Sequence, residues 1–421
     1  MASDIAIIGA GYVGLPLAVA FGQAGARVHC VDTDASKVEA IRSGESYIPD
    51  VAAGELGPLV ADGRLTAGTD MAAVADVESI LICVPTPLSE NREPDVSIIA
   101  AAAAAIAPHL QRDQLVVLES TTYPGTTREL LAPLLEQSGL TAGTDFHLAM
   151  SPERIDPGRT DHTVRTTPKV VGGLTPACAK RARELYEVCV DTIVPVSSPD
   201  AAELVKLLEN IFRSVNIALV NELAMLCDRL ALDVWEVIDA AATKPYGFMR
   251  FTPGPGLGGH CIPIDPFYLS WRARQFDFQT EFIELAGKVN TTMPYFCAER
   301  VSHALNAARK PVNGSKVLVL GVSYKPDVGD VRESPALKLI ELLGELGAEI
   351  SYHDAHVPDL RDEGLDLRSV DLGNGVIEEA DIVCVVTAHS GIDYERLAER
   401  AQLVFDFRNA VPRIDGKVHT L

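Results

Sequence analysis

The sequence predicts an α/β protein in which two doubly wound domains are joined by a long central helix and a helical dimerisation region. An apolar strand near the N-terminus runs into a glycine-rich turn and an apolar helix, and strands alternate with helices again after Lys316. Between these regions, Asp200–Leu230 follows helix-start residues and has the length of one long helix. The predicted domains are residues 1–199, 200–309 and 310–421.

Composition narrows the classes of function. The chain has 421 residues, a formal charge of −22 and 47% hydrophobic residues, so it can form a sizeable core and lacks the basic footprint of a nucleic-acid-binding protein. We find no leader-like start and no run of about 18 apolar residues, so no membrane segment is expected. The 8 cysteines are scattered without a C-x-x-C pair, which disfavours zinc and disulfides and indicates a reducing cytoplasm.

The first motif predicts a dinucleotide site in a Rossmann-like domain. The strand Asp4–Ile8 leads into Gly9-Ala10-Gly11-Tyr12-Val13-Gly14, which opens an apolar helix. In a βαβ unit with this spacing, Gly9 permits the tight turn, Gly11 lets the backbone approach a pyrophosphate, and Gly14 lets the helix pack on the strand. The helix N-terminus supplies amide donors and the positive end of the helix dipole.

An acidic residue completes this motif. The next strand, Arg27–Val31, ends on Asp32, which would accept a hydrogen bond from a ribose 2′-hydroxyl and repel a 2′-phosphate. NAD is therefore favoured over NADP. Lys37 can flank the adenosine, although a solvated helix lysine is an equally good interpretation.

Three polar turns follow the next predicted strands, which are Ser79–Val84, Leu115–Leu118 and Phe146–Met150. The turns contain Pro85 and Thr86, then Thr121, then Glu153 and Arg154. Ligands of open parallel sheets bind at the carboxyl ends of strands, so three such turns in succession favour contact with a cofactor. Ordinary turn chemistry explains each of them singly.

The central helix carries Lys206, Asn210 and Arg213 in an apolar setting. Spacings of four and three residues place them on one helix face, which suits recognition of an anionic ligand. The alternative is a lysine that snorkels out of an apolar surface.

A glycine loop after the central helix, Pro253–Pro266, contains a single thiol, Cys261, and Asp265 four residues later. Its glycines permit sharp turns and close approach of a ligand. The alternative is a surface loop with a chance cysteine.

The last domain predicts a second α/β unit whose strands are Lys316–Leu320, Glu349–His353, Ile382–Thr387 and Leu403–Phe407. Its first loop lacks the dinucleotide glycine spacing and carries Lys325 and Arg332. This favours a phosphate or sugar-nucleotide site and disfavours a second dinucleotide.

Taken together, the motifs resemble the UDP-glucose/GDP-mannose dehydrogenase family of nucleotide-sugar 6-dehydrogenases, essentially from end to end. The resemblance depends on GAGYVG at 9–14, VPTP at 84–87, STTYPGT at 120–126, the Lys-x-x-x-Asn helix, GGHCIPID at 258–265 and SYKPDVGDVRES at 323–334. It implies NAD-dependent, four-electron oxidation of a sugar C6 alcohol to a carboxylate through a covalent thioester.

The resemblance also implies roles. Lys206, Asn210 and Asp265 manage the proton and the developing oxyanion in the first oxidation, and Cys261 is the nucleophile. Glu153 is the base that hydrolyses the thioester, and Thr121 positions the water. His260 is assigned no catalytic role.

Binding residues carried over for NAD are Gly9, Gly11, Tyr12, Val13, Gly14, Asp32, Lys37, Pro85, Thr86, Thr121, Glu153 and Arg332. Those for the nucleotide sugar are Glu153, Arg154, Lys206, Asn210, Arg213, Arg250, Phe251, Gly254, Gly258 and Lys325.

The predicted substrate is a nucleotide sugar, and the Cys loop most resembles UDP-N-acetylglucosamine 6-dehydrogenases. Ile264 and the turn Ser151–Arg154 depart from the UDP-glucose branch. UDP-N-acetylmannosamine, UDP-N-acetylgalactosamine, UDP-glucose and TDP-glucose stay open, as do a two-electron dehydrogenase and a non-catalytic NAD-binding module. A homodimer or higher homo-oligomer is expected through the long apolar helix.

Overall fold

The computed structural model describes residues 4–48, 51–88, 93–154, 162–259 and 262–421. The chain divides into two compact units. The first consists of Met1–Glu209 with Phe267–Gln279, and the second consists of Asn210–Pro266 with Thr280–Leu421.

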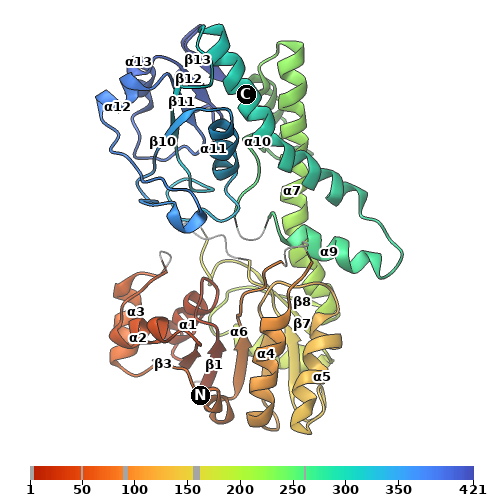
Figure 1. Cartoon of the computed structure of the whole chain (residues 1–421). Coiled ribbons are helices and arrows are strands. Elements are labelled where there is room, and N and C mark those ends of the chain that lie inside the picture. Colours follow the sequence, from red (N-terminus) through yellow and green to blue (C-terminus); the bar gives the residue numbers. More distant parts are fainter. Residues whose placement is uncertain (1–3, 49–50, 89–92, 155–161, 260–261) are drawn as a thin grey trace. The chain divides into compact units, whose positions relative to one another are not determined.

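The first unit is built on an eight-stranded sheet with the order β3-β2-β1-β4-β5-β6-β7-β8 (Figure 1). Every neighbouring pair is parallel except β6 and β7. The order of its first strands is that of a dinucleotide-binding fold. The strands are β1 (Asp4–Ile8), β2 (Arg27–Val31), β3 (Leu65–Gly68), β4 (Ser79–Ile82), β5 (Leu115–Leu118), β6 (His147–Met150), β7 (Lys169–Gly173) and β8 (Ile193–Val196).

Helices cover both faces of this sheet because alternate strand residues are apolar on each side. Ile5, Ile7 and Val117 pack with residues of α1, α3 and α6, whereas Ile8, Ile80 and Leu118 pack with α4 and α5. The helices are α1 (Gly14–Gln23), α2 (Ala35–Ser43), α3 (Ala53–Ala61), α4 (Ser97–Ile106), α5 (Ala132–Leu135), α6 (Pro176–Tyr186) and α9 (Asp265–Arg274), the last of which starts in the segment assigned to the second unit.

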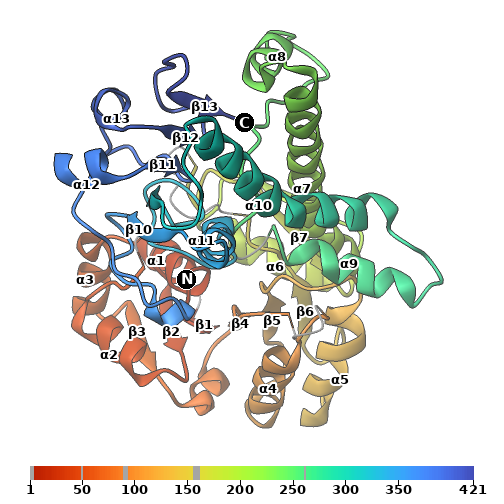
Figure 2. The same cartoon turned by 45° about the horizontal axis from the view of Figure 1, so that its top comes forward.

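The second unit contains a five-stranded, all-parallel sheet with the order β10-β9-β11-β12-β13. Residues of α10 and α11 pack on one face, and residues of α12 and α13 pack on the other (Figure 2). The elements are α8 (Val234–Ala242), α10 (Glu281–Ala307), β9 (Lys316–Leu320), α11 (Pro335–Glu345), β10 (Glu349–His353), α12 (Asn374–Glu379), β11 (Ile382–Val385), α13 (Tyr394–Arg400), β12 (Val404–Asp406) and β13 (Val418–Thr420).

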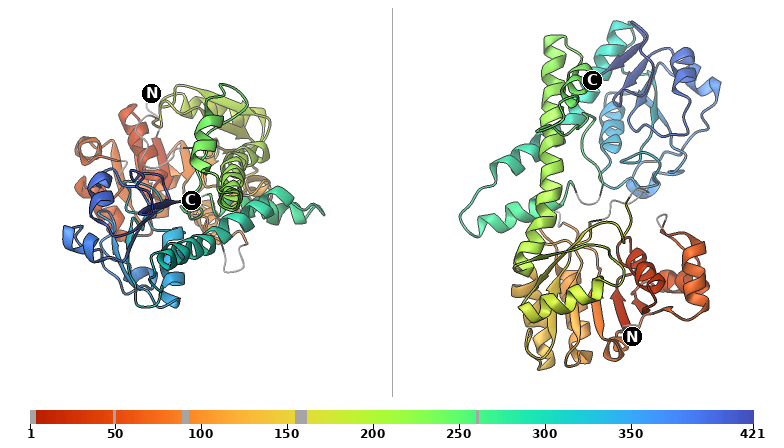
Figure 3. Two further views of the ribbon diagram at one scale, coloured as in Figure 1. Left: turned by 90° about the horizontal axis from the view of Figure 1, so that it is seen from above. Right: turned by 180° about the vertical axis from the view of Figure 1, so that it is seen from behind.

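The central helix α7 runs unbroken from Pro199 to Leu230, so its first part belongs to the first unit and its remainder to the second (Figure 3). This confirms the predicted α/β class with two doubly wound sheets and a long central helix. Four strands were not predicted: β3, β7, β8 and β13. Within the described residues, no helix is both long and apolar enough to cross a membrane.

Candidate functional site

The glycine turn between β1 and α1 has the geometry expected for a dinucleotide. Gly9 adopts a φ of +93°, and a Cβ on Gly14 would lie 1.9 Å from the Gly9 carbonyl oxygen, so only glycine lets the helix start here. A Cβ on Gly11 would meet no atom within 4 Å, which leaves its face open to a ligand. Tyr12 is exposed, and Val13 is the residue at the helix N-cap.

Asp32 lies beside this turn. Its Oδ2 accepts a hydrogen bond from the Ala10 amide at 2.8 Å, and its Oδ1 accepts one from the Asp34 amide at 2.9 Å. The Lys37 Nζ is 3.9 Å from the Asp32 Oδ2, a long ion pair in which the lysine is partly exposed. A partly exposed carboxylate next to open amide donors is what an NAD ribose and pyrophosphate require.

The turns after β4 and β5 are fixed by long-range hydrogen bonds. The Tyr268 hydroxyl, from α9, donates to the carbonyl oxygens of Thr86 and Pro87 at 2.8 and 3.0 Å. Thr86 is buried and Pro85 is exposed. The Ser120 hydroxyl donates to the Val84 carbonyl at 2.7 Å, which connects the two turns. Tyr268 was not predicted, because its partners lie far away in the sequence.

Glu203 holds the segment after Thr121. Its carboxylate, on α7, accepts from the Gly125 amide at 2.6 Å and from the amide and hydroxyl of Thr127 at 2.8 and 2.7 Å. Burial raises the pKa of Glu203 to about 7, although these hydrogen bonds oppose the rise. No signal in the sequence singles out Glu203, because α7 carries several other charged residues, Glu209 and Glu222 among them. Thr121 itself is half-buried in the turn.

Glu153 lies in a buried charge cluster that the sequence did not reveal. The Lys169 Nζ, at the start of β7, is 2.7 Å from the Glu119 Oε2 and 3.7 Å from the Glu153 Oε2. The Arg154 amide donates to the Glu153 Oε1 at 2.6 Å. Pro152, Glu153, Arg154, Val164, Thr167, Pro168 and Lys169 line a shallow recess on this side of the unit.

Arg154 reaches two partners in the first unit. Its Nη2 is 2.6 Å from the Glu209 Oε1, and its Nη1 donates to the Pro168 carbonyl at 2.6 Å. A guanidinium that is held by Glu209 of α7 and by Pro168, the residue before β7, is well placed to contact a polar group near Glu153.

The three residues of the predicted polar face on the central helix differ in their exposure to solvent. Lys206 and Asn210 are buried, whereas Arg213 is exposed. The Asn210 amide donates to the Asp265 Oδ2 at 2.5 Å, and Asp265, the first residue of α9, is also buried. This brings two of the predicted catalytic residues together from positions 55 residues apart.

The glycine loop before α9 is held by buried amides. The Gly254 amide donates to the Asn221 Oδ1 at 3.0 Å, and the Asn221 amide donates to the Asn290 Oδ1 at 2.9 Å. A Cβ on Gly254 would lie 2.5 Å from Arg408 Nη1, and one on Gly258 would lie 2.6 Å from the Tyr324 Cβ. The glycines therefore permit close packing on the chain itself. The predictions for Cys261 and His260 fall outside the described residues.

The remaining predicted ligand residues lie in the second unit and have protein partners. Arg250 is exposed and contacts Asp239 at 2.7 Å, and the Phe251 ring packs edge-on against Phe212. Arg332 contacts Asp330 at 2.6 Å. The Lys325 Nζ lies 5.6 Å from the centre of the Tyr324 ring.

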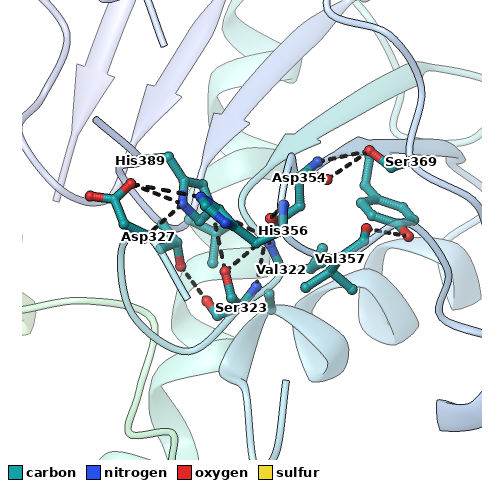
Figure 4. A network of polar contacts seen from close by, with 12 residues as sticks. Val322, Ser323, Asp327, Asp354, His356, Val357, Ser369 and His389 are labelled. Carbon is teal, nitrogen blue, oxygen red and sulfur yellow. Dashed lines mark hydrogen bonds and ion pairs between the residues drawn. The ribbon is translucent and has the colours of Figure 1, made fainter. Parts of the chain in front are cut away.

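One cluster among the described residues offers three metal-ligating side chains: Asp327, His356 and His389, with ligand atoms within 4.8 Å of one another (Figure 4). The His389 Nδ1 accepts the Asp327 backbone N–H at 3.0 Å, so a neutral ring carries its proton on Nε2, which lies 3.1 Å from the Asp354 Oδ2. Both ring nitrogens are thus committed to protein groups, and the cluster anchors the loop after β9.

Thiols outside the Cys loop are shielded. Cys30, Cys83, Cys178, Cys189, Cys227, Cys297 and Cys384 are free and buried. Burial raises the pKa of Cys30, Cys189 and Cys384 to about 12 and that of Cys83 and Cys297 further, so these thiols are poor nucleophiles.

Family models match most of the chain. They are the NAD binding domain of the UDP-glucose/GDP-mannose dehydrogenase family at residues 3–190, its central domain at 200–292 and its UDP binding domain at 318–413. The predicted boundaries at 199 and 309 stay predictions.

Curated relatives cover nearly the whole length of the chain. A UDP-N-acetyl-D-mannosamine dehydrogenase of Pyrococcus horikoshii is 34% identical over 97% of this chain and 96% of its own. An NDP-N-acetyl-D-galactosaminuronic acid dehydrogenase of Ralstonia solanacearum is 35% identical over 96% of this chain and 95% of its own.

Solved structures agree with this. The structure of the UDP-D-ManNAc dehydrogenase from Pyrococcus horikoshii superposes with a TM-score of 0.90 at 33% identity, covering 99% of this chain and 98% of the other. A UDP-glucose dehydrogenase from Pyrobaculum islandicum gives a TM-score of 0.87 at 27% identity, covering 100% and 97%.

Proposed function

The chain belongs to the UDP-glucose/GDP-mannose dehydrogenase family and is an NAD-dependent nucleotide-sugar dehydrogenase, and we propose that it oxidises the C6 alcohol of a UDP-N-acetylhexosamine to the uronic acid. The overall change converts one alcohol, one water and two NAD⁺ into one carboxylate, two NADH and three protons. Atoms, charge and four electrons balance in this stoichiometry.

The observation that carries the proposal is the buried hydrogen bond between Asn210 and Asp265. It fixes a carboxylate four residues after Cys261 in sequence. Lys206 precedes Asn210 by one turn of α7 and is likewise buried. A buried amide and carboxylate that satisfy each other can order a water or a substrate hydroxyl, whereas a non-catalytic NAD-binding module would have no use for them.

When bound, NAD would supply the hydride acceptor for the sugar C6 in the first oxidation. Lys206 and Asp265, through a water, take up the hydroxyl proton and stabilise the developing oxyanion, while Asn210 holds the carboxylate in place. In our proposal the Cys261 thiolate then attacks the aldehyde carbon, forming a C–S bond. Loss of a second hydride converts this thiohemiacetal into a thioester.

Hydrolysis completes the reaction. Water, positioned by Thr121, attacks the thioester carbonyl carbon and gives a proton to Glu153. The C–S bond breaks with its electron pair on sulfur, which regenerates the Cys261 thiolate and leaves a carboxylic acid. The remaining proton of this acid passes to solvent as the carboxylate is released.

For the sugar, the names of the relatives favour an N-acetylmannosamine or N-acetylgalactosamine configuration. The sequence-based preference for UDP-N-acetylglucosamine has no support from these names. Arg154 and Arg213 are our candidates for contacts with the sugar. Phe251, Gly254 and Gly258 are candidates for the loop that lies against it. Arg250 and Lys325 are candidates for the nucleotide phosphates, and Arg332 for NAD.

The test is the yield of NADH per mole of sugar with UDP-N-acetylmannosamine, UDP-N-acetylgalactosamine, UDP-N-acetylglucosamine, UDP-glucose and TDP-glucose. We expect two NADH with an N-acetylhexosamine and a free uronic acid as product. Cys261→Ser should abolish net turnover. One NADH with release of an aldehyde would overturn the four-electron assignment.

We also propose that the chain forms a homodimer through α7 and α10. Apolar side chains are exposed along α7 at Phe212, Leu219, Leu226 and Leu230, spaced by seven, seven and four residues, which places them on one face. On α10, Phe282 and Leu285 are exposed as well. An exposed apolar stripe of this length is typical of a protein interface.

Light scattering on the double variant Leu219→Glu/Leu226→Glu tests this interface. We expect a dimer for the wild type and a monomer for the variant, because two buried carboxylates would face an apolar partner. A control variant, Leu346→Glu, changes an exposed leucine that follows α11 and should leave the dimer intact. A wild-type monomer, or a variant that stays dimeric, would overturn the proposal.

A further inference from the structure

Lys169 is a buried lysine without a role in the steps above. It is the first residue of β7, which pairs antiparallel with β6 through Ala149 opposite Gly173 and Met150 opposite Gly172. Glu153 lies three residues beyond the end of β6, in the turn that follows it. The pairing of β6 with β7 therefore brings the start of β7, which carries the lysine, close to the turn that carries the proposed hydrolytic base.

Two carboxylates share the ammonium group. The Lys169 Nζ is 2.7 Å from the Glu119 Oε2 and 3.7 Å from the Glu153 Oε2. Glu119 follows β5 directly, so the three residues come from the ends of three adjacent strands. Lys169 is 5% exposed and Glu119 1% exposed, and both lie within the first unit.

A second layer holds Glu119. The Tyr186 hydroxyl, at the end of α6, hydrogen-bonds to the Glu119 Oε1, and the Lys169 Nζ lies 5.0 Å from the centre of the Tyr186 ring. Each Glu119 oxygen thus has a partner: Tyr186 contacts Oε1 and Lys169 contacts Oε2. Tyr186 holds the carboxylate in place, and the carboxylate holds the lysine. On the opposite side, the Arg154 amide holds the Glu153 Oε1, so that the Oε2 faces Lys169.

Electrostatics keep the lysine charged. Burial lowers the pKa of Lys169, but Glu119 and Glu153 more than compensate and raise it to about 12. Burial raises the pKa of Glu119 to about 7, with Lys169 opposing part of that rise. The ion pair with Glu119 alone would be enough for a lysine with a purely structural role. The Lys169 ammonium also lies within ion-pair distance of Glu153, which is less buried than Glu119.

We propose that Lys169 is a positioning residue for thioester hydrolysis: it orients the Glu153 carboxylate, and Glu119 and Tyr186 hold Lys169 in place. The inference rests on the proposed function, in which Glu153 accepts a proton from the water that attacks the thioester carbon as the C–S bond breaks. Lys169 therefore acts on the last step and leaves both hydride transfers unaffected.

The experiment follows NADH formation in a rapid-mixing assay with full-length enzyme, NAD⁺ and the UDP-N-acetylhexosamine that gives the fastest wild-type turnover. For Lys169→Met we expect a burst of two NADH per active site at close to the wild-type rate. The steady-state rate should then fall by at least about tenfold. Mass spectrometry of the quenched protein should show the covalent adduct accumulating. Lys169→Arg, which keeps the charge, should restore turnover to within about threefold of wild type.

A matched control is Lys180→Met on α6, an exposed lysine 3.8 Å from Glu184, which should behave as wild type. If Lys169→Met folds poorly, Lys169→Met/Glu119→Gln also removes the buried counter-charge, and we expect the same split between burst and steady state.

Equal loss of burst and steady state in these variants, or no loss of either, would overturn the inference. Failure of the proposed function is distinguishable, because it would appear in the wild type as one NADH and a free aldehyde. That result would remove the inference as well.

Discussion

Both units start their sheets with the same backbone arrangement and use it differently. In the first, the amide of Gly9 donates to the carbonyl of Val31 at 2.8 Å, and in the second, the amide of Gly321 donates to that of His353 at 3.0 Å. Both glycines have positive φ, +93° and +78°. In each case an aspartate follows the neighbouring strand, Asp32 in one and Asp354 in the other.

The surroundings of the two aspartates differ. Asp32 is partly exposed beside the open face of Gly11. The Asp354 Oδ2, in contrast, accepts hydrogen bonds from the amides of Val322 and Ser323, both at 3.0 Å, and from the Ser323 hydroxyl at 2.8 Å (Figure 4). Its Oδ1 accepts from the His356 amide at 2.8 Å.

This difference fits the sequences of the two turns. The first unit has the glycine spacing of a dinucleotide site, and the second does not. In the glycine turn of the first unit, Gly11 has no side chain that could cover the backbone N–H groups, so Asp32 stays available to a ribose. Where Ser323 occupies the turn, its side chain and the histidine saturate the aspartate, which becomes part of the fold. An aspartate at the same place in the two sheets is thus left partly exposed in one unit and stabilises a loop in the other.

The largest effect on stability is expected in the glycine turn between β1 and α1, where one glycine is needed for packing and another faces the ligand side. Gly14→Ala forces a Cβ to 1.9 Å from the Gly9 carbonyl, and we expect a loss of about 3 kcal/mol or more of unfolding free energy. Gly11→Ala meets no atom within 4 Å and should leave stability unchanged while weakening NAD binding. Denaturant unfolding and NAD titration measure the two. Equal stability of the variants would contradict the assignment.

Asp354→Asn should destabilise the second unit by about 3 kcal/mol. A neutral side chain accepts weaker hydrogen bonds than the carboxylate does, and its NH2 group would point at backbone N–H groups that need an acceptor. Burial would raise the pKa of Asp354, but hydrogen bonds from His389 and the Ser323 and His356 amides outweigh it and hold the pKa well below its usual value. The folded-state pKa is therefore depressed below the unfolded value.

The pH dependence follows from that sign. The stabilisation by Asp354 is fully present above about pH 4, the unfolded value, and is lost as pH falls through the lower folded value. Unfolding free energy measured between about pH 6 and pH 2.5 should decline less steeply in Asp354→Asn than in wild type. Parallel curves would contradict this.

Asp32→Asn should have the smallest effect on stability and a selective effect on cofactor. We expect NAD affinity to fall about tenfold, equivalent to about 1.4 kcal/mol, and discrimination against NADP to decrease, because the repulsion of a 2′-phosphate is removed. Titration with both cofactors measures this. The melting temperature serves as the control, since unlike Asp354 this side chain is partly exposed. Unchanged NADP affinity would contradict the role.

Local patterns were sufficient to predict the parts of the fold that depend on neighbours in sequence. The first strands, the glycine turn with Asp32 and the helix from Pro199 to Leu230 are of this kind. The strand β7 is not, because it pairs antiparallel with β6 and the two strands are separated by a long connecting segment. Its apolar run followed by glycines was ambiguous without that partner.

The site residues that were missed share one property. Lys169 contacts Glu119 across 50 positions, Glu203 contacts Thr127 across 76, and Tyr268 contacts Thr86 across 182. Their side chains are common types in common settings, so only the fold reveals their partners. Asn210 and Asp265 were predicted, because their motifs identify them, yet the hydrogen bond that joins them was not.

The burial of seven thiols has a practical consequence for measuring this enzyme. Burial raises the pKa of five of them, and buried thiols with raised pKa values react slowly with alkylating reagents. We therefore expect rapid, stoichiometric alkylation of the native protein to report on Cys261, the proposed nucleophile. One equivalent of a chromogenic thiol reagent could serve as an active-site titrant, giving the concentration of competent enzyme without any sugar substrate.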